Sequence, residues 1–236
     1  MTSAPSPRGQ IPLALGFRER PGFDLFYPGD NAGARDYVMR VAAGRVHSSV
    51  YLWGPPGSGK SHLLQAACLH AGEWGRPVVY VPLAQHAEFD PQLIADLDAL
   101  SLVCIDDIDA IAGLEAWEQP LLHLYNRLRD KACGMLMAGK ANPRRLDFKL
   151  EDLRSRMAWD LVFHLKPLND EDKIAVLMRR AAARSFDLPR EVAAYLVRRV
   201  RRDLPSLIRL VGTLEEATLA EQRKLTVPFV RELLEK

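Results

Sequence analysis

The sequence has few cysteines, and none of them are close together. The three in this chain of 236 residues are Cys68, Cys104 and Cys133. An odd number without a close pair excludes a disulfide framework and a paired-cysteine metal site. This cysteine usage is typical of a reducing compartment, so we expect a cytoplasmic protein. No run of about 18 apolar residues occurs, so we expect no membrane-spanning helix.

The sequence also has little net charge. There are 32 basic and 30 acidic residues, which gives a formal charge of +2. That value is too close to zero for a protein that works by coating nucleic acid. Hydrophobic residues make up 48% and charged residues 26%, as in an ordinary globular protein. The length predicts one large domain or two small ones.

The hydrophobic pattern divides the chain into three parts. Residues 1–22 hold four of the sixteen prolines and show little periodicity, so we interpret them as a flexible tail. Over 23–167, short apolar runs alternate with helical patterns, which predicts an α/β domain with a parallel five-stranded sheet flanked by helices. Over 168–236 the pattern is helical throughout and predicts a small all-helical domain.

The boundaries of the expected elements follow from these runs. Strands are expected at 49–53, 78–81, 102–105, 135–138 and 161–165. Helices are expected at 60–72, 91–100 and 114–131, with a short one before the last strand, and then at 170–185, 189–201, 203–224 and 227–235. The four tryptophans are expected to be in the core or half-buried.

Residues 54–61, GPPGSGKS, match the phosphate-binding pattern G-x-x-x-x-G-K-[ST] in full. The motif lies between an expected strand and an expected helix, which is the context in which such loops bind nucleotides. Its glycines let backbone N–H groups approach phosphate oxygens, and the helix start adds the positive end of its dipole. Lys60 is expected to reach the β- and γ-phosphates, and the Ser61 hydroxyl to bind Mg²⁺. The candidate ligands in this stretch are Gly54, Pro55, Pro56, Gly57, Ser58, Gly59, Lys60, Ser61 and His62.

Two acidic residues follow the third expected strand. An acid at the carboxyl end of a buried strand meets the phosphate crevice of such a sheet. We therefore expect Asp106 to hold Mg²⁺, directly or through water, and Asp107 to orient an attacking water. An apolar strand that ends in Asp is by itself equally consistent with a helix N-cap. The phosphate loop favours the metal-binding interpretation.

These motifs resemble the AAA+ ATPases and, among them, the DnaA-related family. The resemblance covers residue 23 to the end. It rests on the phosphate loop with the following His-Leu-Leu, on the IDD at the end of the third strand, on the helical C-terminal part, and on FDLFYPGDN at 23–31. It implies an AAA+ fold with a helical lid and a site for ADP or ATP with Mg²⁺. It also implies that Asn31 lies near the nucleotide, because the 23–31 segment resembles the one that covers adenine in DnaA.

Within this family, the arrangement is similar to small regulators that switch the initiator DnaA off. We expect a short tail before the ATPase domain and no DNA-reading helix-turn-helix after the lid. The tail sequence QIPLAL resembles the peptide by which such regulators dock on the sliding clamp, the β subunit of DNA polymerase III. This implies clamp contacts by Gln10, Ile11, Leu13 and Leu15. A tail that packs back on its own domain is the open alternative.

Arg156, the last residue of the segment LRSR, corresponds in this family to an arginine finger. Such an arginine reaches a neighbouring subunit's γ-phosphate, where a planar cation raises the rate by about 10³–10⁵ when supplied in trans. For an arginine taken alone, a surface ion pair with Glu151 or Asp152 is the more common situation. It is the resemblance that implies the finger.

Two positions depart from the DnaA pattern. Lys140 stands where the residue after the fourth strand is usually acidic, and the nearby Asn142 could replace it. The nucleotide-sensing arginine of the lid falls at Pro205, with Arg202 and Arg209 about one helical turn to either side. Both departures weaken the expectation of efficient hydrolysis by this chain itself, but they leave nucleotide binding untouched.

The resemblance therefore implies a regulator that limits chromosomal replication initiation by promoting hydrolysis of DnaA-bound ATP. The implied partners are DnaA and the clamp, with DNA reached through the clamp and no membrane. The basic cluster at Arg198, Arg199, Arg201 and Arg202 is open to two interpretations, a DNA contact or a solvated face. A homodimer or larger assembly also stays open. The alternatives are a helicase-loader-like or transposition-helper ATPase that turns over its own ATP, and an adaptor with a structural nucleotide.

Overall fold

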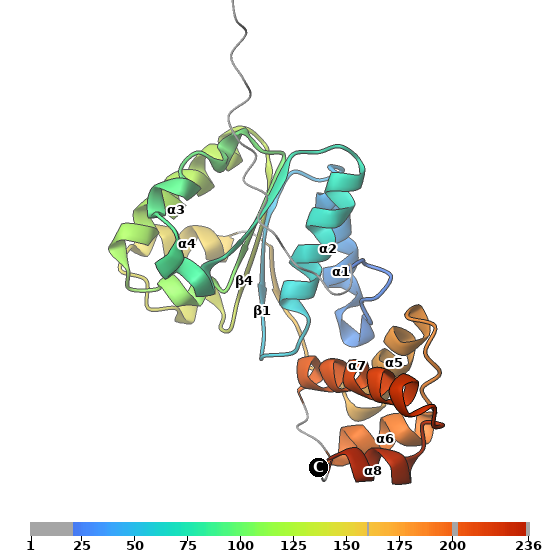
Figure 1. Cartoon of the computed structure of the whole chain (residues 1–236). Coiled ribbons are helices and arrows are strands. Elements are labelled where there is room, and N and C mark those ends of the chain that lie inside the picture. The colour runs from blue at the N-terminus through green and yellow to red at the C-terminus, as the bar shows by residue number, and fades with distance from the viewer. Residues whose placement is uncertain (1–20, 160, 200–202, 235–236) are drawn as a thin grey trace, which may run out of the picture.

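A computed structural model describes residues 21–159, 161–199 and 203–234 (Figure 1). It contains a parallel sheet between two layers of helices, followed by a bundle of four helices, α5 to α8. We call this bundle the lid. The expected fold class is confirmed. In the described part of the chain, no helix is long and apolar enough to cross a membrane.

The sheet has five parallel strands in the order β2-β3-β4-β1-β5. They are β1 (Ser49–Trp53), β2 (Val78–Pro82), β3 (Leu102–Asp106), β4 (Gly134–Gly139) and β5 (Leu161–His164). All residues of β3 and β4 are buried, because helices cover both faces of the sheet. The carboxyl ends of β1 and β3 lie at the same edge of this parallel sheet, where ligands of such folds bind.

Two pairs of helices cover the two faces of the sheet (Figure 1). Helices α1 (Ala32–Ala42) and α2 (Lys60–Glu73) cover one face, and α3 (Glu115–Asp130) and α4 (Glu151–Trp159) cover the other. Successive side chains of β1 point to opposite faces of the sheet, so this strand contributes to the core on both faces. Val50 and Leu52 pack with α1 and α2, while Tyr51 packs with α3 and α4.

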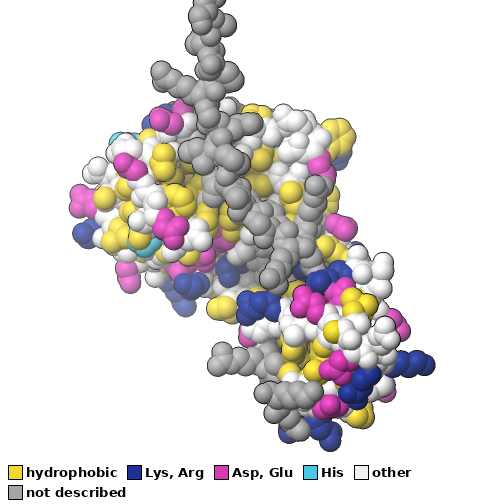
Figure 2. Space-filling model, in the orientation of Figure 1, with side chains coloured by type: hydrophobic (Ala, Val, Ile, Leu, Met, Phe, Trp, Pro, Cys, Tyr) yellow, Lys and Arg dark blue, Asp and Glu magenta, His cyan; other side chains and the backbone are white. Residues whose placement is uncertain are grey.

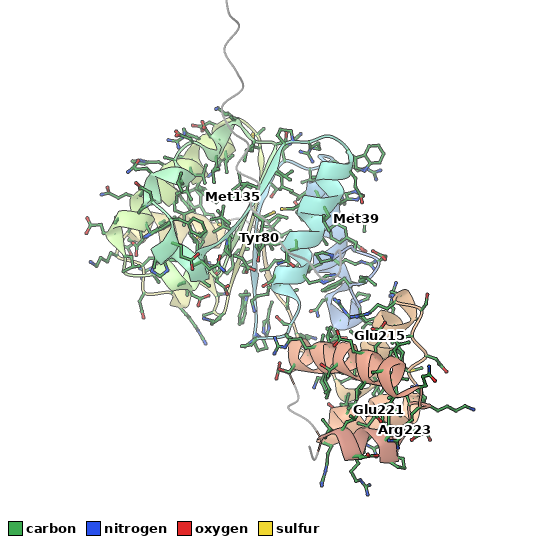
Figure 3. The ribbon with its side chains drawn as sticks, in the orientation of Figure 1. Met39, Tyr80, Met135, Glu215, Glu221 and Arg223 are labelled. Carbon is green, nitrogen blue, oxygen red and sulfur yellow. The ribbon has the colours of Figure 1, made fainter. Side chains whose placement is uncertain are left out.

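The lid has a hydrophobic core of its own. Its helices are α5 (Asp170–Ala183), α6 (Arg190–Arg199), α7 (Leu204–Glu221) and α8 (Val227–Leu234). Side-chain caps start two of them: Asn169 accepts a hydrogen bond from Asp172 N at 2.8 Å, and Asp203 accepts one from Ser206 N at 2.9 Å. On the lid surface, Arg223 bonds Glu221 at 3.2 Å and Glu232 at 3.0 Å (Figure 3).

Some local expectations were wrong. The helix expected at 91–100 is replaced by two short 3₁₀ segments, Pro91–Ile94 and Leu97–Ala99. The tail expected at 1–22 is not one of these, because it lies almost wholly outside the described residues and stays a prediction. Trp74 and Trp159 are each 74% exposed rather than buried, because each lies at the end of a helix, α2 and α4 respectively. The Arg129 guanidinium lies 5.9 Å from the centre of the Trp159 ring.

Candidate functional site

The loop between β1 and α2 has a backbone that only glycine adopts easily. Gly57 and Gly59 have φ values of 79° and 93°. A Cβ added at Gly54 would lie 2.4 Å from Leu165 O, and one at Gly59 would lie 2.7 Å from a ring carbon of Phe26. The three glycines of the motif are therefore required for the turn that brings the backbone round to the start of α2.

Lys60, the first residue of α2, folds its side chain back into this loop. Its Nζ donates hydrogen bonds to Gly54 O at 2.8 Å and Pro55 O at 3.1 Å, and the residue is only 8% exposed. Burial lowers the pKa of Lys60, and the nearby Asp106 and Asp107 act in the opposite direction. The ammonium is thus held by neutral carbonyls, in a place where a polyphosphate would supply close negative charge.

The acidic pair lies at the end of β3. Asp106 is 1% exposed, and its Oδ2 and Oδ1 accept hydrogen bonds from Tyr80 OH at 2.6 Å and Asp107 N at 2.9 Å. Asp107 has the left-handed φ of 52°, which Asp tolerates better than most residues. Burial, followed by the charge of Asp106, raises the pKa of Asp107.

The donor set fits Mg²⁺ bound together with a nucleotide. The Ser61 hydroxyl and the Asp106 carboxylate are hard oxygen ligands, and Mg²⁺ usually adds waters and substrate phosphates to one or two carboxylates. Among the described residues, no group of three or more His, Cys, Asp or Glu could hold a metal ion.

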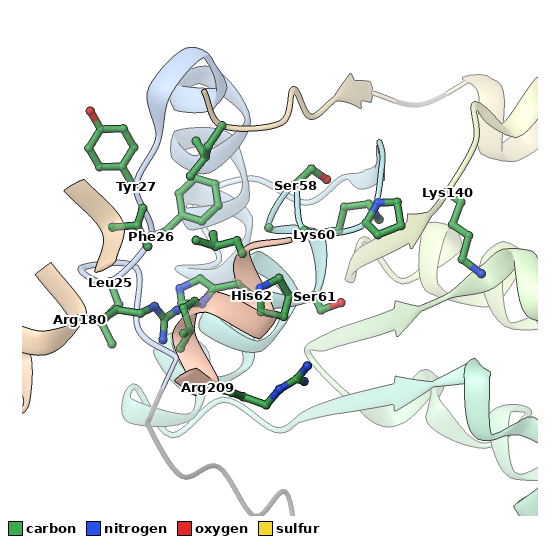
Figure 4. A pocket seen from close by; sticks show the side chains of 18 of the residues that line it. Leu25, Phe26, Tyr27, Ser58, Lys60, Ser61, His62, Lys140, Arg180 and Arg209 are labelled. Atoms are coloured by element: carbon green, nitrogen blue, oxygen red, sulfur yellow. Dashed lines mark hydrogen bonds between the residues drawn. The ribbon is translucent and has the colours of Figure 1, made fainter. Parts of the chain in front are cut away.

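A cavity of about 510 Å³ lies between the phosphate loop and the lid (Figure 4). This volume lies within the range of small-molecule sites. One wall consists of the phosphate loop with 25–27, and the opposite wall comes from α5 and α7 with Leu168. The start of α7 approaches the loop closely, since a Cβ on Gly57 would lie 3.6 Å from Pro205 Cδ and 3.7 Å from Leu204 N.

Most of the residues proposed from the sequence come together here. The cavity is lined by Pro56, Gly57, Ser58, Gly59, Lys60, Ser61, His62, Asp107 and Arg209. Gly54 and Pro55, at the start of the loop, are not among the lining residues, and their carbonyls hold Lys60. Asp106 is not a lining residue either, but it directly precedes Asp107, which is. Arg202 and the tail residues Gln10, Ile11, Leu13 and Leu15 lie outside the described residues.

Two asparagines are not brought into this cavity. Asn31 is 4% exposed and pairs with the backbone of Lys166: its Nδ2 donates to Lys166 O at 3.0 Å, and its Oδ1 accepts from Lys166 N at 2.8 Å. Asn142 accepts from Arg144 N at 3.1 Å and caps a short 3₁₀ turn. Both amides thus serve the backbone, Asn31 by tying the start of α1 to the segment that leads into the lid.

Arg156 also lies outside the cavity. Its Nε bonds Asp152 Oδ2 at 3.0 Å, which is the surface ion pair considered as the alternative. Its carbonyl accepts a hydrogen bond from the buried Tyr125 OH at 3.2 Å, so the end of α4 is fixed to α3. Arg154, on the same helix, pairs with Glu151 at 3.1 Å.

Two further cations line the cavity. Arg180, on α5, lies 3.1 Å from Nδ1 of His62, whose Nε2 lies 2.9 Å from Gly22 O. No motif marks Arg180, since it is one of two adjacent arginines on the amphipathic helix α5. Lys140 forms an ion pair with Asp109 at 2.9 Å, which raises the pKa of Lys140. The cavity therefore receives positive charge from both domains.

A parallel sheet with a phosphate loop after β1, an acidic pair after β3 and a helical lid across the cavity define an AAA+ protein. The family model of the bacterial DnaA ATPase domain matches residues 17–164, and the lid-domain model of Hda matches residues 170–234. The chain therefore belongs to the DnaA-related AAA+ family, and its lid is of the Hda type.

Solved structures show the same fold. Domain III of DnaA from Thermotoga maritima has a TM-score of 0.77 at 22% identity, over 91% of this chain and 95% of that one. AMPPCP-bound DnaA from Aquifex aeolicus has a TM-score of 0.68 at 21% identity, over 84% and 67%. RuvB from Thermotoga maritima has a TM-score of 0.70 at 18% identity, over 92% and 72%. The DnaA-like fold thus binds an adenine nucleotide analogue in the Aquifex protein.

Proposed function

We propose that this chain regulates chromosomal replication initiation by promoting hydrolysis of the ATP bound to DnaA. It attaches through residues 10–15 to the sliding clamp on DNA and supplies Arg156 to the ATP site of a DnaA molecule. One observation supports the proposal most strongly. The family model of the bacterial DnaA ATPase domain matches the first part of the chain, and the family model of the Hda lid domain matches the part that follows it. We place the boundary between the ATPase domain and the lid at 167–168.

In this proposal the chain's own cavity binds ADP or ATP with Mg²⁺. Lys60 exchanges its two carbonyl contacts for phosphate oxygens, and the N-terminus of α2 faces the same phosphates. Ser61 and Asp106 would hold Mg²⁺, which neutralises phosphate charge when bound. Arg180 and Arg209, which line the cavity from the lid, would contact the nucleotide from the opposite side.

The setting of Arg156 supports its action on another molecule. Its pair with Asp152 is an i,i+4 surface ion pair, of a kind worth about 0.3–0.5 kcal/mol. A finger supplied in trans is worth about 10³–10⁵ in rate, or roughly 4–7 kcal/mol. Leaving Asp152 for a γ-phosphate therefore costs little compared with the gain, while the Tyr125 hydrogen bond keeps the helix in place.

Two features favour weak hydrolysis by this chain itself. Lys140 is held by Asp109 at the position that is usually acidic in DnaA. Pro205, which has no donor, lies against the phosphate loop at the position of the sensing arginine. Hydrolysis would then occur chiefly in the DnaA partner.

The test measures hydrolysis of DnaA-bound ATP with this chain, the clamp and DNA. Arg156→Ala is expected to lower the stimulated rate by about 10³ while ADP binding stays normal, because the transition-state charge loses its cation. Arg154→Ala is the matched control from the same helix and should act like the wild type. In a second arm, a variant with Gln10, Leu13 and Leu15 changed to Ala should lose clamp pull-down and the clamp-dependent part of the stimulation.

Normal stimulation by Arg156→Ala would refute the assignment of the finger. Retained clamp binding by the tail variant would favour the alternative, in which the tail packs on its own domain. Rapid ATP turnover by the chain alone, stimulated by single-stranded DNA without clamp or DnaA, would favour a helicase-loader-like ATPase instead.

A further inference from the structure

A buried tyrosine contacts the acid at the end of β3. Tyr80 lies on the neighbouring strand β2 and is 7% exposed. Its hydroxyl donates to Asp106 Oδ2 at 2.6 Å, a short bond to a carboxylate that is itself 1% exposed. Figure 3 places Tyr80 within the sheet, between the two helix layers.

The carboxylate of Asp106 is fixed at both oxygens. Tyr80 donates to Oδ2, and the backbone N–H of Asp107 donates to Oδ1 at 2.9 Å. Each carboxylate oxygen has two lone-pair directions, so each keeps the capacity to accept one further ligand. With two donors on opposite oxygens, rotation of the carboxylate would break both bonds.

The surroundings of Tyr80 favour the neutral phenol, which is the form that can donate a hydrogen bond. Burial, followed by the charge of Asp106, raises the pKa of Tyr80.

A second residue acts on the same phenol. A side-chain interaction with Gln65 lowers the pKa of Tyr80, in opposition to burial and to the charge of Asp106. Gln65 lies on α2, four residues after Ser61, and thus one turn along the helix that starts in the phosphate loop.

We infer that Tyr80 is a positioning residue that aims the Asp106 carboxylate at the Mg²⁺ of the bound nucleotide. The inference rests on the nucleotide site of the proposed function but not on clamp binding or Arg156. Without the phenol, Oδ2 of a buried carboxylate has lost its donor, and only the Asp107 N–H would still orient the carboxylate that would hold Mg²⁺. Residues that orient metal ligands typically change metal affinity by about 10–100-fold when removed.

The experiment is calorimetric titration of the full chain with ADP, once with excess Mg²⁺ and once with EDTA. Tyr80→Phe is expected to raise the Kd for ADP by about 10-fold with Mg²⁺ and by less than about 2-fold with EDTA. The matched control is Tyr51→Phe, a fully buried tyrosine on β1 whose hydroxyl donates to Ala141 O at 3.2 Å. It should leave the Mg²⁺ dependence unchanged. In an Asp106→Asn background, Tyr80→Phe should have no further effect.

Equal loss of affinity in both titrations, or none in either, would overturn the inference, as would a wild type whose ADP affinity ignores Mg²⁺. If Tyr80→Phe does not fold, Tyr80→Met, which also lacks the hydroxyl that bonds Asp106, is titrated instead. It should weaken ADP binding by about 10-fold with Mg²⁺ only, and an unchanged Mg²⁺ dependence would count against the inference. A wild type that binds ADP but fails to stimulate DnaA would defeat the proposed function and leave this inference standing.

Discussion

Lys60 is buried, and no acid in the described part of the chain forms an ion pair with it. Its Nζ bonds two carbonyl oxygens, and burial lowers its pKa. A buried ammonium is costly unless it is paired, so a phosphate that pairs with it stabilises the folded chain as well as the complex. Lys60 therefore links nucleotide binding to stability.

Lys60→Ala is expected to abolish stabilisation by nucleotide. At a concentration of Mg²⁺–ADP 100 times its Kd, the wild type should gain about 2.7 kcal/mol, which corresponds to roughly 5–10 °C in Tm for a chain of this size. The variant, measured by the same thermal melt, should shift by less than about 1 °C. Lys131→Ala, which removes an exposed lysine bound to Asp98, serves as the control and should shift like the wild type. A full shift in Lys60→Ala would contradict the assigned phosphate site.

At the residue scale, what the sequence predicted depends on whether partners are neighbours in the chain. The phosphate loop is contiguous, so its residue types and spacing predicted a site that the fold then assembles. Arg180 and Tyr80 reach the site from α5 and β2, and no local pattern marks them. Asn31 was chosen by resemblance, but its amide is used by the Lys166 backbone.

At the scale of elements, Glu118 joins α3 to the segment before α4. It is fully buried, and its carboxylate accepts three backbone hydrogen bonds: from Gly113 N at 2.7 Å, Lys149 N at 3.2 Å and Leu150 N at 2.8 Å. These bonds fix the entry to the helix that carries Arg156, and the Tyr125 hydrogen bond fixes its end.

Glu118→Ala is expected to destabilise the chain by about 2–4 kcal/mol, because three partly buried backbone N–H groups lose a charged acceptor that is itself fully buried. Glu118→Gln should cost less, since its amide keeps one oxygen acceptor. Denaturant unfolding measures both, with the exposed Glu115→Ala on the same helix as a control that should change stability by less than about 0.5 kcal/mol. A loss no greater than that of the control would mean that Glu118 does not hold α4.

Strands were easier to predict than short helices. The continuous apolar runs of β3 and β4 have one physical explanation, burial on both faces. Segment 91–100 begins with an Asp-Pro start that is also found in short turns. In the structure it forms two 3₁₀ segments that both pack against α3, a contact distant in sequence that no local pattern reveals. Helix α1 was not predicted, although Ala34, Val38 and Val41 lie on one buried face of it.

At the scale of the whole molecule, the chain consists of two bodies with separate cores. The sheet has its own clusters on both faces, and the lid has a third. They meet around the cavity, where Pro205 approaches Gly57, and Lys and Arg side chains lie along this junction (Figure 2). Domains joined in this way are expected to move relative to each other unless a ligand holds them together.

Arg209 is expected to transmit nucleotide binding to the lid. It lines the cavity from α7, where it bonds Ser206 Oγ at 3.0 Å and is available to meet a phosphate. With Mg²⁺–ADP at 100 times its Kd, hydrogen exchange should slow in α2 and in the first half of α7 by up to about 100-fold in the wild type. Arg209→Ala, studied at the same multiple of its own Kd, should keep the protection of α2 but lose at least about 10-fold of that in α7, because phosphate then contacts only the sheet domain. Arg190→Ala removes a lid arginine that pairs with Glu171 and should behave like the wild type. Equal protection of both helices in Arg209→Ala would show that the two bodies close together without this arginine.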